Sequence, residues 1–169
     1  MAAARAGDRD AFAQLFARYR DPVWRFFRRR VADSARAEEL AQDVFAGVLS
    51  AAARYQARST FRSYLFGIAF NVLLADRRRL RPSAGSQHPD ELPVRGADMD
   101  DVMWVQQALA ALEEGDREIL MLREYEQLSY QEIADIKGVP VNTVRSQLFR
   151  ARAALRAQLL QGETREARS

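Results

Sequence analysis

Apolar residues recur every three or four positions along most of the chain, the spacing that places them on one face of an α-helix. The first such stretch follows Asp8, a residue type that often caps a helix start, and continues past Pro22. Because proline lacks a backbone N–H and clashes with the preceding turn, we expect Pro22 to kink or restart this helix. The apolar positions of the stretch are Phe12, Leu15, Phe16, Tyr19 and Val23.

Two further helices with an apolar face are predicted before residue 82. The second follows the cap candidates Asp33 and Ser34, and the third begins near Ser59 and Thr60. No segment shows the sustained alternation typical of a strand, so the three helical faces are expected to close one small core. The predicted inward-facing residues are Ala37, Leu40, Ala41, Val44, Phe45, Val48, Leu49 and Ala52 in the second helix, and Phe61, Tyr64, Leu65, Ile68, Ala69, Val72 and Leu73 in the third.

Residues 82–98 interrupt the helical pattern. They include three prolines and two glycines with almost no apolar periodicity, which is typical of a linker. A helix is then predicted from about Met99 to Glu114–Gly115, and Asp116 is a candidate cap for the next one. The predicted inward-facing residues are Val102, Val105, Leu109 and Leu112, followed by Ile119, Leu120, Leu122 and Tyr125.

Residues 129–155 carry the most specific local pattern in the chain. Ser129 and Glu132 have the spacing of a capping box, which opens a short helix. Gly138 is placed to end that helix in the left-handed conformation that glycine adopts at little cost. Pro140 then prevents the helix from resuming at once. Two helices separated by a tight turn are therefore predicted here.

A short capped helix, a glycine turn and a longer basic helix together form a helix-turn-helix pattern. The longer helix is expected to begin at Asn142 or Thr143 and to pack back through Val144 and Leu148. Side chains near the start of such a helix enter the DNA major groove, where one arginine bound to guanine discriminates by about 1–3 kcal/mol. The alternative is an ordinary helical hairpin with a solvated basic face. The outward-facing residues are Arg145, Ser146, Phe149 and Arg150.

Charge is divided unevenly along the chain. Residues 1–81 contain 16 Arg and 8 acidic residues, and residues 82–135 contain 3 Arg and 13 acidic residues. Residues 136–169 contain 7 Arg or Lys and 2 acidic residues, which completes the net charge of +3. Two basic blocks on either side of an acidic one indicate two separate contacts with a polyanion.

The composition includes few of the residue types that commonly act in catalysis. The 169 residues include no cysteine and one histidine, His88, which lies between prolines. No apolar run approaches the ~18 residues of a membrane span, and the N-terminus has no apolar signal core. We therefore expect an all-α protein of two small helical domains that acts in the cytoplasm. No catalytic residue, metal site or cofactor site is predicted.

Two further surfaces are candidates for binding. The third predicted helix and the loop before it interleave arginines with aromatic residues, which suits single-stranded DNA, although most of these aromatics also fall on the core face. The second predicted helix carries an acidic face, which is either solvated or a docking surface for a protein. A carboxylate metal site there is disfavoured, because no histidine or matching pair of acids completes it. The acidic face comprises Glu38, Glu39, Gln42 and Asp43.

Taken together, these motifs resemble the extracytoplasmic-function class of bacterial RNA polymerase sigma factors, from about Asp8 to Leu160. AEELAQDVF is similar to the polymerase-binding helix of that family, and STFRSYLFGIAFN to the segment that recognises the −10 element. The stretch from ALEEGDREIL to FRARAAL resembles the −35-reading domain. The resemblance implies sigma region 2 in residues 1–81, a linker in 82–98, sigma region 4 in 99–162 and a tail in 163–169.

The resemblance also implies partners and site residues. The implied partners are core RNA polymerase and promoter DNA in double- and single-stranded form. An anti-sigma factor is also implied, because such a partner is common in the family. Polymerase contacts are implied for Glu39, Gln42 and Asp43. Contacts to the −10 element are implied for Arg58, Ser59, Thr60, Phe61, Asn71, Arg77, Arg78 and Arg79, and contacts to the −35 element for Thr143, Arg145, Ser146, Phe149 and Arg150. The implied function is promoter recognition and melting.

The sequence departs from the common family pattern at a few positions. Gly67 and Phe70 stand where the family usually has basic residues, and Gln147 replaces a frequent arginine. The acid that follows Asn71 comes at Asp76, one residue later than usual.

Two alternatives belong to other classes. A stand-alone helix-turn-helix regulator that binds duplex operator DNA would explain the second block but has no need of the acidic helix in the first. An enzyme acting on nucleic acid would need a carboxylate cluster or an activated nucleophile, which the sequence does not assemble.

Overall fold

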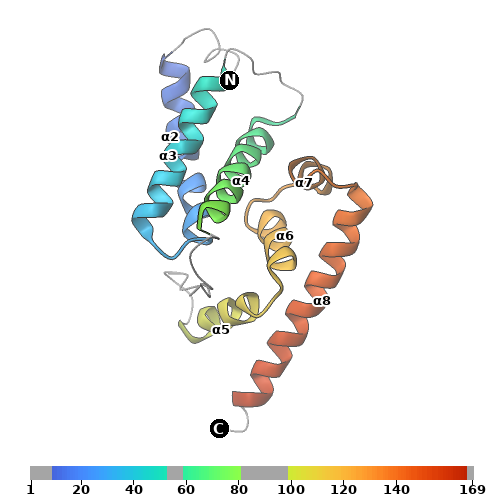
Figure 1. Ribbon diagram of the computed structural model, residues 1–169. Coiled ribbons are helices and arrows are strands. Elements are labelled where there is room, and N and C mark those ends of the chain that lie inside the picture. Colours follow the sequence, from blue (N-terminus) through green and yellow to red (C-terminus); the bar gives the residue numbers. More distant parts are fainter. Residues whose placement is uncertain (1–8, 53–58, 81–98, 167–169) are drawn as a thin grey trace. The chain divides into compact units, whose positions relative to one another are not determined.

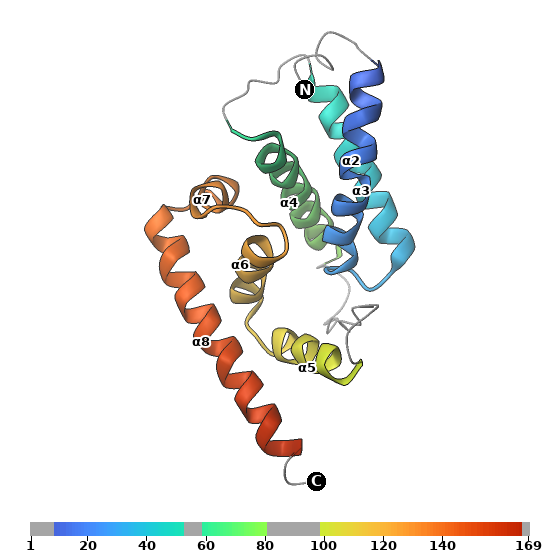
Figure 2. The ribbon, with the colours of Figure 1, turned by 180° about the vertical axis from the view of Figure 1, so that it is seen from behind.

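A computed structural model describes residues 9–52, 59–80 and 99–166 of the chain. The chain divides into two compact units, Met1–Pro89 and Asp90–Ser169. The described residues form helices and contain no strand (Figures 1 and 2). The prediction of two small all-α domains is therefore confirmed, while the predicted linker 82–98 and the cap candidate Asp8 lie outside the described residues.

The described residues of the first unit form three helices: α2 (Arg9–Arg28), α3 (Ser34–Ala51) and α4 (Phe61–Leu80). α3 packs against both α2 and α4, and α2 also contacts α4, so the three apolar faces meet. Burying large aromatic and aliphatic side chains in this way supplies most of the stability of a small domain. Fully buried large side chains at its centre include Phe26, Phe27, Leu40, Leu65, Phe66 and Leu73.

Of the two alternatives predicted at Pro22, a kink or a restart, the restart is wrong, because α2 continues through this residue to Arg28. A proline inside a helix removes one backbone hydrogen bond. The residues just after it, Val23, Phe26 and Phe27, are completely buried. Their packing keeps the helix in one piece despite the lost bond.

The beginning of α3 was predicted correctly. Asp33 is the N-cap, and its carboxylate accepts hydrogen bonds from the backbone N–H groups of Ala35 at 3.0 Å and Arg36 at 3.3 Å. These bonds satisfy donors that have no partner inside the helix.

Between residues 99 and 166 the second unit forms four helices: α5 (Met99–Ala110), α6 (Glu114–Glu124), α7 (Tyr130–Lys137) and α8 (Val141–Glu166). α8 is the longest, and α5, α6 and α7 all pack against it. α8 also continues four residues beyond position 162, after which the sequence predicted a tail. The completely buried core residues of this unit are Ile119, Leu122, Leu128, Ile133, Val144, Leu148 and Ala151.

The end of α5 and the start of α6 differ from the prediction. α5 ends at Ala110 rather than at Glu114–Gly115, and Asp116 lies in the first turn of α6 instead of capping it. Glu113 holds the N-cap position without a side-chain hydrogen bond. Acidic side chains in a first turn interact favourably with the positive end of the helix dipole, so an acid-rich start does not by itself mark the cap.

Four residues predicted to face inward are exposed in the structure. Periodicity identifies the face of a helix, but the width of the contact with its neighbours decides which residues at its edges are covered. The ring of Phe16 still meets that of Phe45 edge-on at 4.8 Å. The four exposed residues are Phe16, Leu49, Val105 and Tyr125.

Within the described part of the chain, no helix is long and apolar enough to cross a membrane.

Candidate nucleic-acid interface

The turn between α7 and α8 forms as the sequence predicts. The Ser129 hydroxyl accepts from the Glu132 backbone N–H at 3.2 Å, and the Glu132 carboxylate accepts from the Ser129 N–H at 2.8 Å. At the other end of α7, Gly138 has φ 66° and ψ 37°. Its N–H and that of Val139 both bond to the Ala134 carbonyl. The predicted capping box and left-handed glycine are both confirmed.

α8 begins one residue earlier than predicted. Its first residue is Val141, directly after Pro140, whose carbonyl accepts hydrogen bonds from the N–H groups of Thr143 at 2.9 Å and Val144 at 3.2 Å. Proline is well placed just before a helix because its missing N–H is not needed there. Pro140 therefore ends the turn of the helix-turn-helix, and the second helix begins at the next residue.

The start of α8 separates a buried face from an exposed one. Val144, Leu148 and Ala151 have no exposed surface, whereas the side chain of Phe149 is 76% exposed. Arg145, Ser146 and Arg150 are also exposed, and Thr143 is half-buried. The Arg145 guanidinium donates to the Asn142 amide oxygen at 3.2 Å, and the Ser146 hydroxyl donates to the Thr143 carbonyl at 3.0 Å. The outward residues predicted for this helix are therefore brought together on one accessible surface.

The start of α4 combines exposed polar side chains with a pair of packed aromatic rings. Ser59 and Thr60 are exposed, and the Thr60 hydroxyl accepts from the Ser63 N–H at 3.2 Å, which caps the helix. Phe61 is half-buried, with its ring edge-on to that of Tyr19 at 5.3 Å. The predicted site residue Arg58 lies outside the described residues.

The basic and aromatic residues of α4 do not form one surface. Phe66 and Phe70 are buried, at 0% and 6% exposure, so they belong to the core and cannot stack on bases. Asn71, Arg78 and Arg79 are exposed, and Arg77 is half-buried. Asn71 and Arg78 are two turns apart and lie on one side of the helix.

The acidic face of α3 is accessible. Glu38, Glu39, Gln42 and Asp43 are all exposed, as a docking surface requires. The described part of the chain holds no group of three or more Asp, Glu or His residues arranged for a metal ion.

Arg36 links this acidic face to α4. Its guanidinium donates to Glu39 at 2.6 Å and, through Nε, to Asp76 at 3.1 Å, and it forms an ion pair with Asp76. The pKa of Arg36 is raised above its usual value, chiefly by the hydrogen bond to Asp76 and then by the bond to Glu39. Arg36 therefore holds one residue of the acidic face and the last turns of α4 together.

Sequence reasoning missed the role of Asp76, although a signal was present. Asp76 follows Ala69 and Leu73 at helical spacing, so it falls on the core face, and it is 3% exposed. A buried carboxylate needs a charged or hydrogen-bonding partner. That partner, Arg36, lies 40 positions before Asp76 in the sequence.

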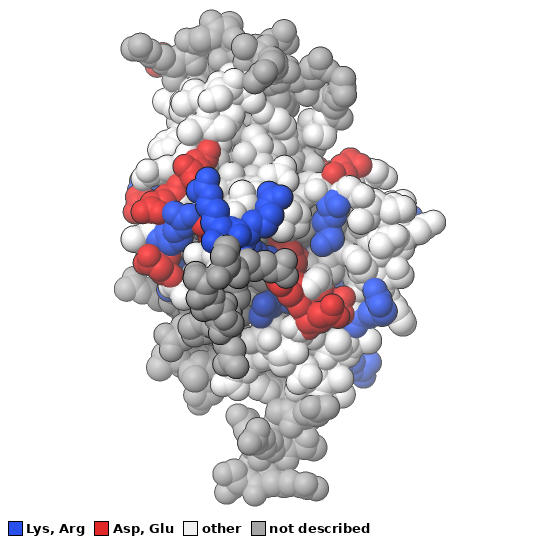
Figure 3. Space-filling view, viewed as in Figure 1, with Lys and Arg blue, Asp and Glu red and all other residues white. Residues whose placement is uncertain are grey.

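Charged side chains of both signs adjoin one another on the face drawn in Figure 3.

Comparison with known proteins matches both units. The family described as sigma-70 region 2 matches residues 15–82, and sigma-70 region 4 matches residues 103–155. RNA polymerase sigma-H factor of Pseudomonas aeruginosa is 34% identical, with 88% of this chain and 86% of that protein covered. ECF RNA polymerase sigma factor SigC of Mycobacterium tuberculosis is 32% identical, with 93% and 87% covered.

Solved structures with a similar fold also match the chain. CnrH, solved in complex with the cytosolic domain of CnrY, superposes with a TM-score of 0.71 at 27% identity, over 92% of each chain. The fold also matches that of the sigma factor RpoE from Bartonella quintana, solved with the anti-sigma factor NepR. That match has a TM-score of 0.72 and 24% identity and covers 88% of this chain and 96% of the other.

A stand-alone helix-turn-helix regulator would account for residues 103–155 and leave the match over residues 15–82 unexplained. The two region matches and the two relatives, each covered over most of its length, together establish that the chain belongs to the extracytoplasmic-function class of RNA polymerase sigma factors.

Proposed function

We propose that the chain directs core RNA polymerase to promoters by contacting the −35 element through α8 and the −10 element through α4 and the residues just before it. The observation that carries this proposal is the face at the start of α8. There, Arg145, Phe149 and Arg150 are exposed, whereas Val144 and Leu148 of the same two turns are buried. A helix fixed in this way by a turn and a core presents its first two turns to the major groove.

Specific roles follow for the α8 residues. Arg145 and Arg150 are proposed to read base edges or hold phosphates, since arginine does both in DNA complexes. Phe149 offers an apolar surface suited to a thymine methyl group. Thr143 and Ser146 lie at the helix start, where hydroxyl groups reach the phosphate backbone.

The first unit is proposed to hold the opened DNA. Arg58, Ser59 and Thr60, together with Phe61 at the start of α4, would capture an unstacked base. Asn71 and the arginines Arg77, Arg78 and Arg79 would contact the backbone beside it. Extruding a base costs a few kcal/mol, more than such a small surface is expected to supply alone.

Polymerase is therefore proposed to be required for melting. Glu39, Gln42 and Asp43 on the exposed face of α3 would contact the polymerase. Two weak DNA contacts held on one platform gain from a high effective concentration. The mechanism is one of binding without catalysis, and it places the protein in the cytoplasm with the polymerase and the chromosome.

A protein inhibitor of the anti-sigma type is proposed as a further partner. CnrH, which matches the chain over 92% of both lengths, was solved in complex with the cytosolic domain of another protein. A partner of this kind would control when the chain reaches the polymerase.

The experiment that tests the proposal mixes the purified chain with core polymerase and promoter templates. We expect the two proteins to co-migrate in gel filtration and transcription to begin at new positions. The variants Glu39→Gln and Asp43→Asn, combined, should weaken co-migration. Unchanged start sites in the presence of the chain would refute the proposal.

A further inference from the structure

Arg36 of α3 joins two surfaces to which the proposed function gives different partners. Its Nη1 donates to the Glu39 carboxylate at 2.6 Å, and Glu39 lies on the exposed acidic face proposed to contact polymerase. Its Nε donates to Asp76 Oδ1 at 3.1 Å, and its Nη2 forms an ion pair with the same oxygen. Asp76 directly precedes the three consecutive arginines in the last turn of α4, which are proposed to contact DNA. One guanidinium therefore lies between a polymerase contact and a DNA contact.

The two contacts of Arg36 differ in burial and therefore in what they do. The Asp76 side chain is 2% exposed, and its other oxygen, Oδ2, has no hydrogen-bond partner among the described residues. A buried carboxylate that loses its charged partner is strongly destabilised, so this contact holds the end of α4 against α3. The Glu39 side chain is 62% exposed. An ion pair there contributes little to stability, but it still cancels the charge of Glu39.

Arg36 is a positive charge at the edge of the acidic face. Positions 36, 39 and 43 are spaced by three and four residues, so they share one side of α3. The hydrogen bond to Asp76, followed by that to Glu39, raises the pKa of Arg36, and its side chain stays charged. No other basic residue occurs in α3. The one positive charge of this helix is therefore bound to an acid proposed to meet the polymerase.

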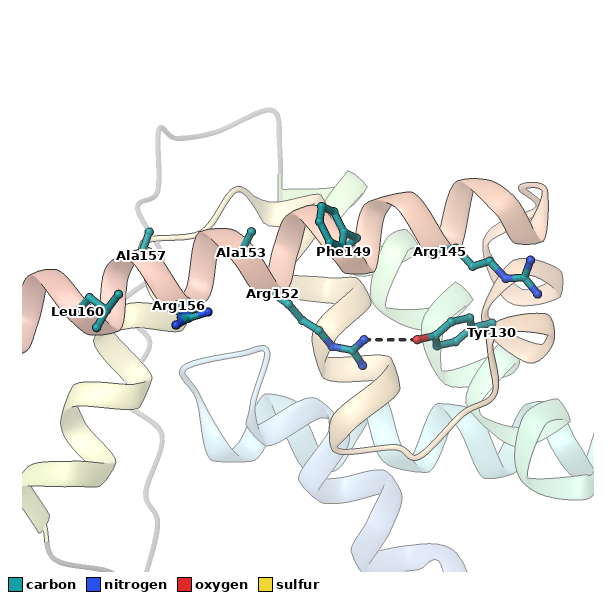
Figure 4. A pocket seen from close by; sticks show the side chains of 8 residues that line it. All are labelled: Tyr130, Arg145, Phe149, Arg152, Ala153, Arg156, Ala157 and Leu160. Atoms are coloured by element: carbon teal, nitrogen blue, oxygen red, sulfur yellow. Dashed lines mark hydrogen bonds between the residues drawn. The ribbon is translucent and has the colours of Figure 1, made fainter.

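Arg152 of α8 also bridges two helices, but in a different setting. It donates to the Tyr130 hydroxyl of α7 at 3.3 Å, as Figure 4 shows, and to the Glu124 carboxylate of α6 at 2.8 Å. The side chains of Arg152 and Glu124 are 47% and 53% exposed, so neither charge depends on the other for its solvation. Arg152 carries the same charge as Arg36 without a buried carboxylate or the acidic face of α3 beside it.

Two simpler roles explain only part of the arrangement around Arg36. A purely structural bridge accounts for the buried contact with Asp76 but gives no purpose to the bond with exposed Glu39. A direct contact between Arg36 and polymerase would need an acidic patch on the polymerase, whereas Glu39, Gln42 and Asp43 call for a basic one. Because interfaces are complementary in charge, Arg36 repels the surface that these acids attract.

We propose that Arg36 is a positioning residue with two opposed effects: it holds the last turn of α4 in place for DNA, and it weakens polymerase binding by neutralising Glu39. A basic surface of the polymerase competes with Arg36 for Glu39 when the two proteins associate. This inference rests on the proposed function, because it takes the acidic face as the polymerase contact and the end of α4 as a DNA contact.

Two variants that break the same buried contact separate the two effects. Arg36→Gln removes a positive charge beside the acidic face, and Asp76→Asn removes a negative one. Both should reduce permanganate reactivity of −10 thymines about threefold or more at saturating polymerase. Arg36→Gln should bind core polymerase about two- to fivefold more tightly, by anisotropy of the labelled full chain, whereas Asp76→Asn should show no gain. A gain in both variants, or in neither, would overturn the proposal, because a merely structural role affects both alike.

Glu39→Gln identifies the acid through which Arg36 acts. In the Glu39→Gln background, Arg36→Gln should give little or no gain in polymerase binding, since the two residues are coupled. An undiminished gain would overturn the proposal. If Glu39→Gln and Asp43→Asn both leave polymerase binding unchanged, the proposed function fails at the acidic face and the inference falls with it. If they weaken binding while Arg36→Gln gives no gain, only the inference fails.

A control and a second variant guard against effects of net charge and of unfolding. Arg152→Gln, the matched control, should leave polymerase binding unchanged, and a gain equal to that of Arg36→Gln would overturn the proposal. The combined variant Arg36→Gln with Asp76→Asn leaves no unpaired buried charge, so it should fold even if Arg36→Gln alone does not. It still frees Glu39 and should bind polymerase about two- to fivefold more tightly. Absence of that gain in the folded variant would overturn the proposal.

Discussion

α8 and α4, the two helices proposed to contact promoter DNA, display their side chains in opposite ways. In α8, Arg145 and Phe149 lie on an exposed face over a buried one formed by Val144 and Leu148. In α4, the aromatic Phe66 is fully buried, and the polar site residues are spread along the helix, from Ser59 and Thr60 before its start through Asn71 at its middle to the arginines near its end. α8 can therefore bind DNA with one face at its start, whereas α4 contributes much of its surface to a core.

The two helices also differ in what holds them. α8 is preceded by two features formed between residues close in the chain, the capping box of Ser129 and the left-handed Gly138. α4 depends on distant parts of the chain, since Asp76 near its end is bound by Arg36 at the start of α3. Substitutions should therefore affect stability most in α4 and recognition most in α8.

The largest contrast is expected between two phenylalanines. Phe66→Ala should lower the free energy of unfolding by about 3–5 kcal/mol, because it leaves a cavity in the core. Phe149→Ala should change it by no more than about 0.5 kcal/mol, as is usual for an exposed position. Urea unfolding of the full chain measures both. Similar losses in the two variants would contradict the comparison.

Asp76→Asn should have the next largest effect. The amide keeps the shape of the side chain but removes its charge, and hydrogen bonds to charged groups contribute about 1.5–3 kcal/mol. We expect a loss of unfolding free energy in that range, again by urea titration. Asp43→Asn, at an exposed position in α3, is the control and should be nearly neutral. A neutral Asp76→Asn would show that the contact with Arg36 does not hold α4 in place.

Arg145→Ala and Arg150→Ala should affect recognition instead of stability. Loss of a specific arginine contact to a base should reduce discrimination between −35 sequences by about 1–3 kcal/mol. The measurement is a competition between promoter duplexes for the polymerase-bound chain. Association with polymerase should be unchanged. Loss of that association would show that these residues do not act in −35 recognition alone.

The smallest expected effect concerns the turn before α8. Gly138→Ala should cost about 1–2 kcal/mol, because the left-handed conformation is unfavourable for a residue with a side chain. Gly115→Ala is a matched control: a Cβ there meets no atom within 4 Å, and alanine is favoured over glycine inside a helix. Thermal unfolding should show opposite shifts for the two variants. A loss of the same size in both would argue against the special role of the turn.

The sequence predicted α8 better than α4 for a physical reason. Caps, turns and helical periodicity act between residues close in the chain, so Ser129, Gly138 and the outward face of α8 could all be identified. Which aromatics of α4 are buried depends on the packing of α2 and α3 around it, which periodicity does not specify. The Arg36–Asp76 contact joins residues 40 positions apart, beyond the reach of a local pattern.

The most direct test of the central claim is permanganate reactivity of thymines on promoter DNA. Permanganate attacks thymines that are unstacked, so it reports melting. The chain together with core polymerase should make thymines reactive near the −10 element, whereas the chain alone and the polymerase alone should not. Reactivity produced by the chain alone, or none with both proteins present, would contradict the account.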